Sequence, residues 1–284
     1  MKLYLQAEWS YAEPAKSFKE AIASGSKAQY SQPEIPFHPS SMKKLLKGLH
    51  EFQTQHFSRY RDLFEQLAEG QTPRILFITC SDSRIDPNLI TQAEVGDLFV
   101  IRNAGNIIPP FGSANGGEGA AIEYAIHALG IEQVIVCGHS HCGAMKGLLK
   151  LDTLSASMPL VYEWLQHAEA TRRLIQENYG DYVGEELLDA TIAENVLTQI
   201  ENLRTYPVIR AKLHRGEIFL HGWVYRFETG EILAYDAARQ DFVAPYSQLA
   251  TTSGLGYVLP KPEKLSRSWI SPEQADRIYR GSQA

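Results

Sequence analysis

Three short apolar runs, separated by stretches with helical spacing, dominate the centre of this 284-residue sequence. The runs cover residues 75–78, 97–101 and 134–137 and are rich in isoleucine, valine, leucine and phenylalanine. Such runs are typical of strands that are buried on both faces of a parallel sheet. Residues 116–130 between the last two runs are predicted to form a helix. This alternation predicts an α/β fold with a mostly parallel central sheet flanked by helices.

Further helices are expected before and after this centre. From residue 42 to 69 apolar residues recur at spacings near three and four, and Gly70 supplies a stop. Two more helical segments are predicted at about 158–178 and 185–213, with an interruption of the second near Pro207. We assign the leucine and isoleucine stripes of both segments to core packing.

The ends of the chain depart from this pattern. Residues 217–227 alternate like a strand and residues 231–235 return after a Thr-Gly turn, which predicts an antiparallel pair. Short helices are expected to begin at Pro14 and Pro272, within stretches that otherwise lack strong periodicity. The chain is therefore divided into an N-terminal extension with a helical arm, a central domain and a C-terminal extension, over residues 1–41, 42–236 and 237–284.

The composition excludes several classes of protein. The net charge is -6 and the basic residues form no stripe, which argues against a nucleic-acid partner. There is no run of about 18 apolar residues, so no membrane span is expected. Glu8 interrupts the first apolar stretch before a signal-peptide core could form. Three cysteines make a disulfide framework improbable, and a reducing compartment such as the cytoplasm fits better.

Two of these cysteines and one histidine lie at the ends of predicted strands. Cys80 directly follows the first strand, and His139 and Cys142 follow the third. Thiolate and imidazole are preferred zinc ligands, and a catalytic zinc site has three protein ligands and one open position. A spacing of three residues would place His139 and Cys142 on one side of a first helical turn, with Cys80 arriving from a neighbouring strand end. The sequence therefore predicts a metal site at these three residues.

Other interpretations of these residues stay open. A cysteine at the end of an apolar strand is most often simply buried, and a single His-x-x-Cys is a weak signal. His141 is a rival ligand, because it would share a face with His139 if the segment were extended. Cys137 lies inside the third strand, and we assign it to the core.

Asp82 and Arg84 follow Cys80 and lie two residues apart. They form either an ordinary ion pair at a helix start or, beside a metal, a pair that takes part in catalysis. In the second case Asp82 accepts a hydrogen bond from metal-bound water, and Arg84 holds the carboxylate ionised. In a further alternative Asp82 swings in and fills the fourth metal position.

These motifs resemble those of the β-class carbonic anhydrases. The likeness covers about residues 42–236 and includes Cys-Ser-Asp-Ser-Arg at 80–84, His-Ser-His-Cys at 139–142 and Gly-Asp-Leu-Phe-Val-Ile-Arg-Asn-Ala-Gly-Asn at 96–106. The resemblance implies that residues 42–236 are the catalytic domain, with one zinc ion per subunit. The implied site consists of zinc ligands Cys80, His139 and Cys142 and a catalytic pair, Asp82 and Arg84, with Asp82 a fourth ligand only in a closed state.

The implied activity is the reversible hydration of carbon dioxide to bicarbonate by zinc-bound hydroxide, catalysed by a lyase (carbonate dehydratase). The resemblance also implies an obligate dimer that can build larger oligomers such as a hexamer. In that dimer the N-terminal helices would reach onto the partner subunit. A hydrolase of carbon disulfide or carbonyl sulfide is an alternative, because such enzymes use a similar site.

Three further stretches are similar to the carboxysomal carbonic anhydrases of cyanobacteria, namely residues 111–119, 145–150 and 272–281. This similarity implies a place within the carboxysome, where the enzyme would supply carbon dioxide for photosynthetic carbon fixation. It also implies that the C-terminal tail docks to a carboxysome scaffold protein, unless the tail is disordered or packs on itself. A chain that acts mainly as an assembly component, with catalysis secondary, is the alternative. Residues 1–41 match no pattern of the family.

Overall fold

The computed structural model describes residues 39–113 and 116–245 of the chain. The short helices predicted to begin at Pro14 and Pro272 lie outside these residues. The chain divides into two compact units, the first ending at Asp62 and the second beginning at Leu63. The second unit contains the sheet and all the candidate site residues.

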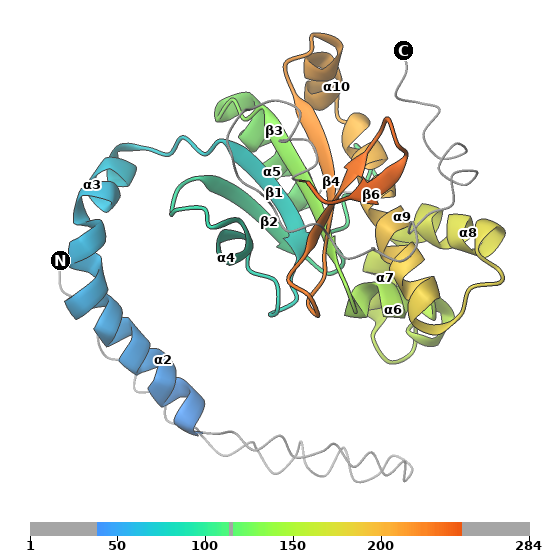
Figure 1. Cartoon of the computed structure of the whole chain (residues 1–284), viewed down its shortest axis with the longest axis horizontal. Coiled ribbons are helices and arrows are strands. Elements are labelled where there is room, and N and C mark those ends of the chain that lie inside the picture. Colours follow the sequence, from blue (N-terminus) through green and yellow to red (C-terminus); the bar gives the residue numbers. More distant parts are fainter. Residues whose placement is uncertain (1–38, 114–115, 246–284) are drawn as a thin grey trace, which may run out of the picture. The chain divides into compact units, whose positions relative to one another are not determined.

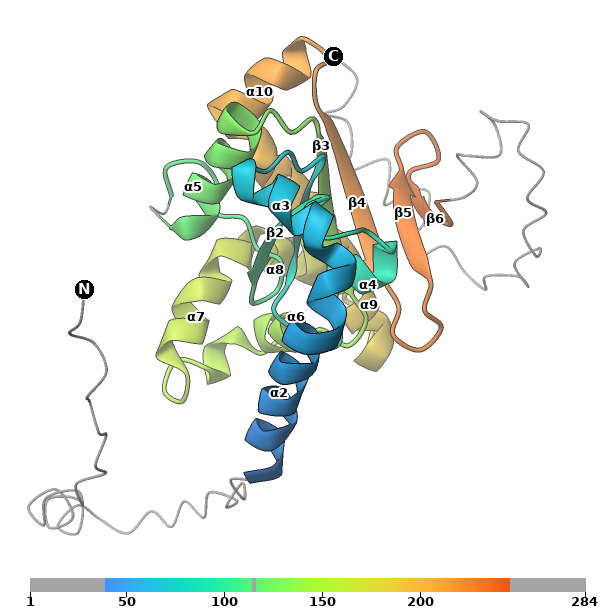
Figure 2. The same cartoon turned by 90° about the vertical axis from the view of Figure 1, so that its left-hand side faces the viewer.

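One six-stranded sheet forms the centre of the second unit, in the order β2-β1-β3-β4-β5-β6 (Figure 1). Its strands are β1 Ile75–Cys80, β2 Leu98–Asn103, β3 Gln133–His139, β4 Phe219–Tyr225, β5 Ile232–Asp236 and β6 Asp241–Val243. The first four run parallel, and β5 and β6 each pair antiparallel with the strand before (Figure 2). The predicted mostly parallel sheet and the predicted antiparallel return are confirmed. The short strand β6 was not predicted.

Burial along the strands follows from their places in the sheet. Every residue of β1 after Ile75 and of β3 after Gln133 is buried, because both strands lie between neighbours and beneath helices. The edge strand β2 is partly exposed, and its buried residues alternate towards its end. Both β1 and β3 extend two residues beyond the predicted apolar runs. The strand ends therefore reach Cys80 and His139.

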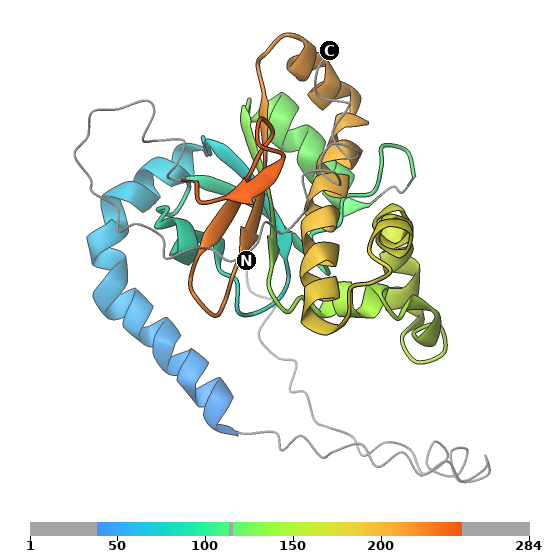
Figure 3. The ribbon, with the colours of Figure 1, turned by 45° about the vertical axis from the view of Figure 1, so that its right-hand side comes forward.

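The long helix α9, Gly184–Arg204, packs on β3 and β4 (Figure 3). Two strand glycines allow this close approach. A Cβ atom on Gly138 would lie 2.9 Å from Val196 Cγ2, and one on Gly222 would lie 3.0 Å from Val196 Cγ1 and from Ile200 Cδ1. Because the helix is covered on several sides, residues 190–197 are all buried, the polar Glu194 and Asn195 among them.

The other helices and helical turns described after residue 70 are shorter. They are α4 Pro87–Thr91, α5 Gly117–Glu123 with the π-helical turn η3 Tyr124–Ala128, α6 Gly143–Leu148, η4 Leu151–Thr153, α7 Pro159–Leu165, η5 Gln166–Ala168, α8 Glu169–Asn178 and α10 Pro207–His214. The two predicted helical segments after the third strand are confirmed. The break at Pro207 occurs because proline fits the first turn of a new helix but not the interior of the old one.

The helical stretch predicted over residues 42–69 is confirmed, but it is not one regular helix. It consists of α2 Pro39–Glu51, the π-helical turn η1 Phe52–His56, the 3-10 turn η2 Phe57–Tyr60 and α3 Arg61–Glu69. In the first unit Leu45 and Leu49 of α2 are 63% and 59% exposed, one helical turn apart. Such an apolar face is typical of a surface that another protein covers. Within the described residues, every helix is too short or too polar to cross a lipid bilayer.

Candidate metal centre

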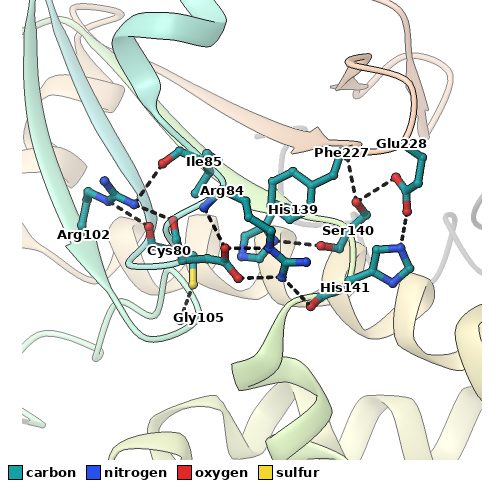
Figure 4. Close-up of polar contacts among 11 residues, drawn as sticks. Cys80, Arg84, Ile85, Arg102, Gly105, His139, Ser140, His141, Phe227 and Glu228 are labelled. Carbon is teal, nitrogen blue, oxygen red and sulfur yellow. Dashed lines mark hydrogen bonds and ion pairs between the residues drawn. The ribbon is translucent and has the colours of Figure 1, made fainter. Parts of the chain in front are cut away.

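Cys80, His139 and Cys142 meet at the carboxyl ends of two neighbouring parallel strands. Figure 4 shows Cys80 and His139 of this group. Cys80 is the last residue of β1, His139 is the last residue of β3, and Cys142 caps the start of α6. Their ligand atoms all lie within 4.8 Å of one another, and all three residues are buried. The structure therefore brings together the three residues that the sequence singles out.

The chain reaches Cys142 through a turn and not, as expected, through a first helical turn that includes His139. His139 is still in β3, and α6 begins only at Gly143. The reversal occurs at His141, whose φ is 55°, in the left-handed region that a residue other than glycine seldom adopts. The expectation was wrong because spacing alone does not show where a strand ends.

The protonation state and surroundings of the His139 imidazole favour binding of a cation. Its Nδ1 lies 2.9 Å from the carbonyl oxygen of Ser140, and since a carbonyl only accepts, Nδ1 carries the proton. Nε2 is therefore left with its lone pair, and among the described residues it is buried without a hydrogen-bond partner. A buried acceptor of this kind is costly unless something binds it. A metal ion on Nε2 would satisfy it, with the backbone carbonyl fixing the ring.

The two thiols interact so closely that only one ionises readily. A hydrogen bond from the Cys142 thiol, together with smaller effects of the His139 ring and of the Gly105 N–H at 3.4 Å, lowers the pKa of Cys80 to about 4. The pKa of Cys142 is raised, because it donates to Cys80 and because burial and the adjacent thiolate oppose a second negative charge. A divalent cation would remove this repulsion and allow both thiolates. Two thiolates and one neutral imidazole are a donor set that zinc prefers.

Asp82 and Arg84 form a bidentate pair beside the two cysteines. Arg84 Nε donates to Asp82 Oδ1 at 2.9 Å, and Nη2 donates to Oδ2 at 2.8 Å. The backbone N–H of Arg84 adds a third bond to Oδ1 at 3.0 Å. These bonds hold the pKa of the Asp82 carboxyl well below its usual range, so Asp82 is ionised near neutral pH. Both carboxylate oxygens face Arg84, and Asp82 is not part of the clustered ligand group.

Arg102 on β2 anchors the loop that follows Cys80, a role that sequence reasoning missed. Its Nε donates to the carbonyl oxygen of Cys80 at 3.0 Å, and its Nη2 donates to those of Asp82 at 2.7 Å and Ile85 at 2.9 Å. One guanidinium thus ties three backbone carbonyls of the loop to the neighbouring strand. An arginine directly after the apolar run 97–101 was the available signal.

His141 and Cys137, the other candidate residues near the triad, contact groups outside it. The His141 ring pairs with Glu185 through Nδ1 at 3.0 Å and with Glu228 through Nε2, so it faces two carboxylates and not the triad. Cys137 is fully buried, and burial raises the pKa of its thiol to about 12, as expected for a core cysteine.

Ser140 links the turn that carries His139 and Cys142, the ligand turn, to the turn after β4. Its Oγ donates to Glu228 Oε2 at 3.0 Å.

Buried amides on α9 hold the loop after β2 against the site. Asn195 Nδ2 donates to the carbonyl oxygen of Gly105 at 3.0 Å, and Gln199 Oε1 accepts from the backbone N–H of Ile108 at 2.8 Å. Gly105 has a φ of +85°, and a Cβ there would lie 2.9 Å from both the Ala144 Cβ and the Met145 Cε. This contact explains why glycine is required where the loop passes Cys80.

Comparison with known proteins gives a consistent result. A sequence profile of the carbonic anhydrase family matches residues 75–232. A carbonic anhydrase of Synechocystis sp. is 56% identical over 273 residues, which cover 85% of this chain and 100% of that relative. The solved structure of the β-carbonic anhydrase CcaA matches with a TM-score of 0.72 and 67% identity, over 72% of this chain and 100% of that one. A structure reported for two tetrameric β-carbonic anhydrases of Sordaria macrospora has a TM-score of 0.55 and 28% identity, over 77% and 96% of the two chains.

The chain therefore belongs to the β-class carbonic anhydrases, as the motifs predicted. It is an enzyme that interconverts carbon dioxide and bicarbonate, and it has a Cys-His-Cys group that could hold a metal ion.

Proposed function

We propose that this carbonic anhydrase works with a zinc ion bound by Cys80, His139 and Cys142. The observation that supports this most strongly is the buried Nε2 of His139, which has no hydrogen-bond partner in the part of the chain that the structure describes and lies beside two buried thiols. Zinc held there would supply Lewis acidity, which makes water a sufficient nucleophile towards carbon dioxide near neutral pH.

The residues around the triad have separate tasks in this proposal. Asp82, kept ionised by Arg84, accepts a hydrogen bond from the attacking water and so orients it. Arg84 occupies both oxygens of Asp82 and thereby keeps the carboxylate away from the metal. If that pair opens, Asp82 becomes free to act as a fourth ligand, which gives a closed state of the site.

Metal removal tests the zinc proposal. Treatment with a zinc chelator should abolish carbon dioxide hydration, and added Zn²⁺ should restore it while Mg²⁺, which prefers oxygen ligands, should not. Full activity in protein shown by metal analysis to contain no transition metal would contradict the proposal.

We further propose that the enzyme acts in the cytoplasm within carboxysomes, where it supplies carbon dioxide for carbon fixation. The support is the likeness of residues 111–119, 145–150 and 272–281 to carboxysomal enzymes, together with the relative from a cyanobacterium. In this proposal residues 237–284 are a C-terminal extension that docks to a scaffold protein, beside a catalytic domain over 42–236 and an N-terminal extension over 1–41.

Truncation tests the docking proposal. A chain that ends at residue 250 keeps every described element and should retain full turnover. It should lose co-purification with carboxysome core proteins, which the full chain should show. Equal co-purification of both chains would contradict a docking tail.

We also propose a dimer that assembles into larger oligomers such as a hexamer, with α2 covering part of the partner subunit. The exposed Leu45 and Leu49 support this, because they give α2 an apolar face. The tetrameric state of the Sordaria macrospora enzymes is consistent with assembly, although it is a property of those proteins.

A further inference from the structure

Phe227 lies in the turn after β4, two residues beyond the end of that strand. Its ring centroid is 4.9 Å from that of His139, with 38° between the ring planes. The guanidinium carbon of Arg84 lies 4.5 Å from the centroid of the same ring. Figure 4 shows the Phe227 side chain reaching from this turn towards both residues. One aromatic ring thus contacts the ligand histidine and the arginine of the Asp82 pair.

Two further contacts, with neither His139 nor Arg84, fix the position of this ring. The backbone N–H of Phe227 donates to Ser140 Oγ at 3.0 Å, and the ring packs edge-on against Tyr225, with centroids 5.3 Å apart. The ring is therefore a preformed surface, because its support comes from the strand end and the ligand turn.

The Arg84 side chain has few other contacts that could hold it in one rotamer. Its side chain is 51% exposed, and its hydrogen bonds go to Asp82 and, at 3.4 Å, to the carbonyl oxygen of His141. A flexible exposed arginine samples many rotamers unless a contact selects one. A cation above an aromatic face is attracted by the ring quadrupole, and a flat guanidinium also stacks well on it.

We propose that Phe227 is a positioning residue for the reaction, whose ring selects the Arg84 rotamer that pairs with both oxygens of Asp82. The same ring limits rotation of the His139 imidazole. This inference rests on the proposed roles of Asp82, Arg84 and His139. The aromatic face of Phe227, and not only the volume of its side chain, holds Arg84 in place.

Phe227→Leu and Phe227→Tyr separate these two properties, because leucine keeps an apolar side chain and tyrosine keeps the ring. Three quantities are measured on the full-length enzyme: kcat and KM for carbon dioxide hydration, bound zinc, and the NMR signal of the Arg84 Nε–H group. That signal is assigned as the one absent in Arg84→Lys. Phe219→Leu is the matched control, since Phe219 is 52% exposed at the opposite end of the same strand.

Phe227→Leu should lower kcat about fivefold, the loss expected for one exposed cation–π contact, with KM and zinc content unchanged. Its Arg84 Nε–H signal should lose the ring-current shift and exchange faster with solvent. Phe227→Tyr should restore kcat and the signal, and Phe219→Leu should match the wild type in all three quantities.

Unchanged kcat and an unchanged Arg84 signal in Phe227→Leu would overturn the inference. So would loss of the folded state in both Phe227 variants, or an equal fall of kcat in the Phe219 control. A wild-type enzyme without carbon dioxide hydration would instead refute the proposed function. The Arg84 signal would still show whether the ring holds the arginine.

Discussion

Arg84 shows how much of this site depends on one side chain. It makes three hydrogen bonds to Asp82, lies over Phe227 and is half exposed, so it contributes little to the core. Arg84→Ala should therefore reduce turnover at least about 100-fold, the scale of a lost acid–base partner, while zinc stays bound. Stopped-flow hydration with parallel zinc analysis measures both, and Arg215→Ala, another exposed arginine paired with a carboxylate, is the control. Zinc loss together with unfolding would mean that the pair is structural.

Arg102 gives a second prediction at this scale. Lysine keeps the charge, but it lacks the planar guanidinium with which Arg102 donates to the carbonyls of Cys80, Asp82 and Ile85 at once. Arg102→Lys should lower kcat roughly tenfold with the fold intact, because a 1 Å shift of a catalytic group has effects of this order or larger. Turnover equal to that of the wild type would show that the loop holds its shape without these bonds.

The sequence predicted the site residues that are recognisable from their side-chain type and from their place at a strand end. It missed the residues that matter because the fold brings them next to the site. Cys80, His139 and Cys142 stood out because thiol and imidazole groups follow apolar runs. Ser140 and Phe227 did not stand out. They bond or pack across about 90 residues of intervening chain, and a contact of that kind is visible only once β3 and β4 are adjacent.

At the scale of secondary structure, α8 and α9 are joined by a buried acid. The Tyr179 hydroxyl donates to Glu194 Oε1 at 2.6 Å, while Oε2 is buried with no hydrogen-bond partner in residues 39–113 and 116–245. Burial raises the pKa of Glu194 from 4.5 to about 7. The charged form is therefore disfavoured in the folded state, and stability falls as the pH rises from 4.5 to about 7. The loss is on the order of 3 kcal/mol and remains at higher pH.

Glu194→Gln should remove this pH dependence, because glutamine keeps the shape but cannot ionise. Urea unfolding at pH 5 and pH 8 measures the effect. The variant should gain stability relative to the wild type at pH 8 and little or none at pH 5. A difference between the two proteins that is the same at both pH values would contradict the assignment of a buried, neutral carboxyl.

The elements themselves were largely predictable, and the exceptions have physical reasons. Buried parallel strands give continuous apolar runs, so β1 and β3 were recognisable without a partner. The strand β6 has three residues, too few for any alternation to show. The π-helical turns in the first helical stretch and after α5 follow no residue pattern that we can identify.

At the scale of the whole molecule, the exposed face of α2 determines assembly in our proposal. Leu45→Glu combined with Leu49→Glu should reduce the mass measured by light scattering, because two charges would have to be buried against the partner. Lys44→Glu, a polar position on the same helix, serves as the control and should leave the mass unchanged. An unchanged oligomer in the double variant would assign the subunit contact to another surface.

The central claim is that carbon dioxide hydration depends on a metal held by Cys80, His139 and Cys142. The most direct test measures bound zinc and hydration rate together in the wild type, in Cys80→Ala and in Cys137→Ala, the last being a buried cysteine of the core. We predict zinc and activity in the wild type and in Cys137→Ala, and loss of both in Cys80→Ala with the fold retained. A Cys80→Ala enzyme that keeps both its zinc and its rate would contradict the account.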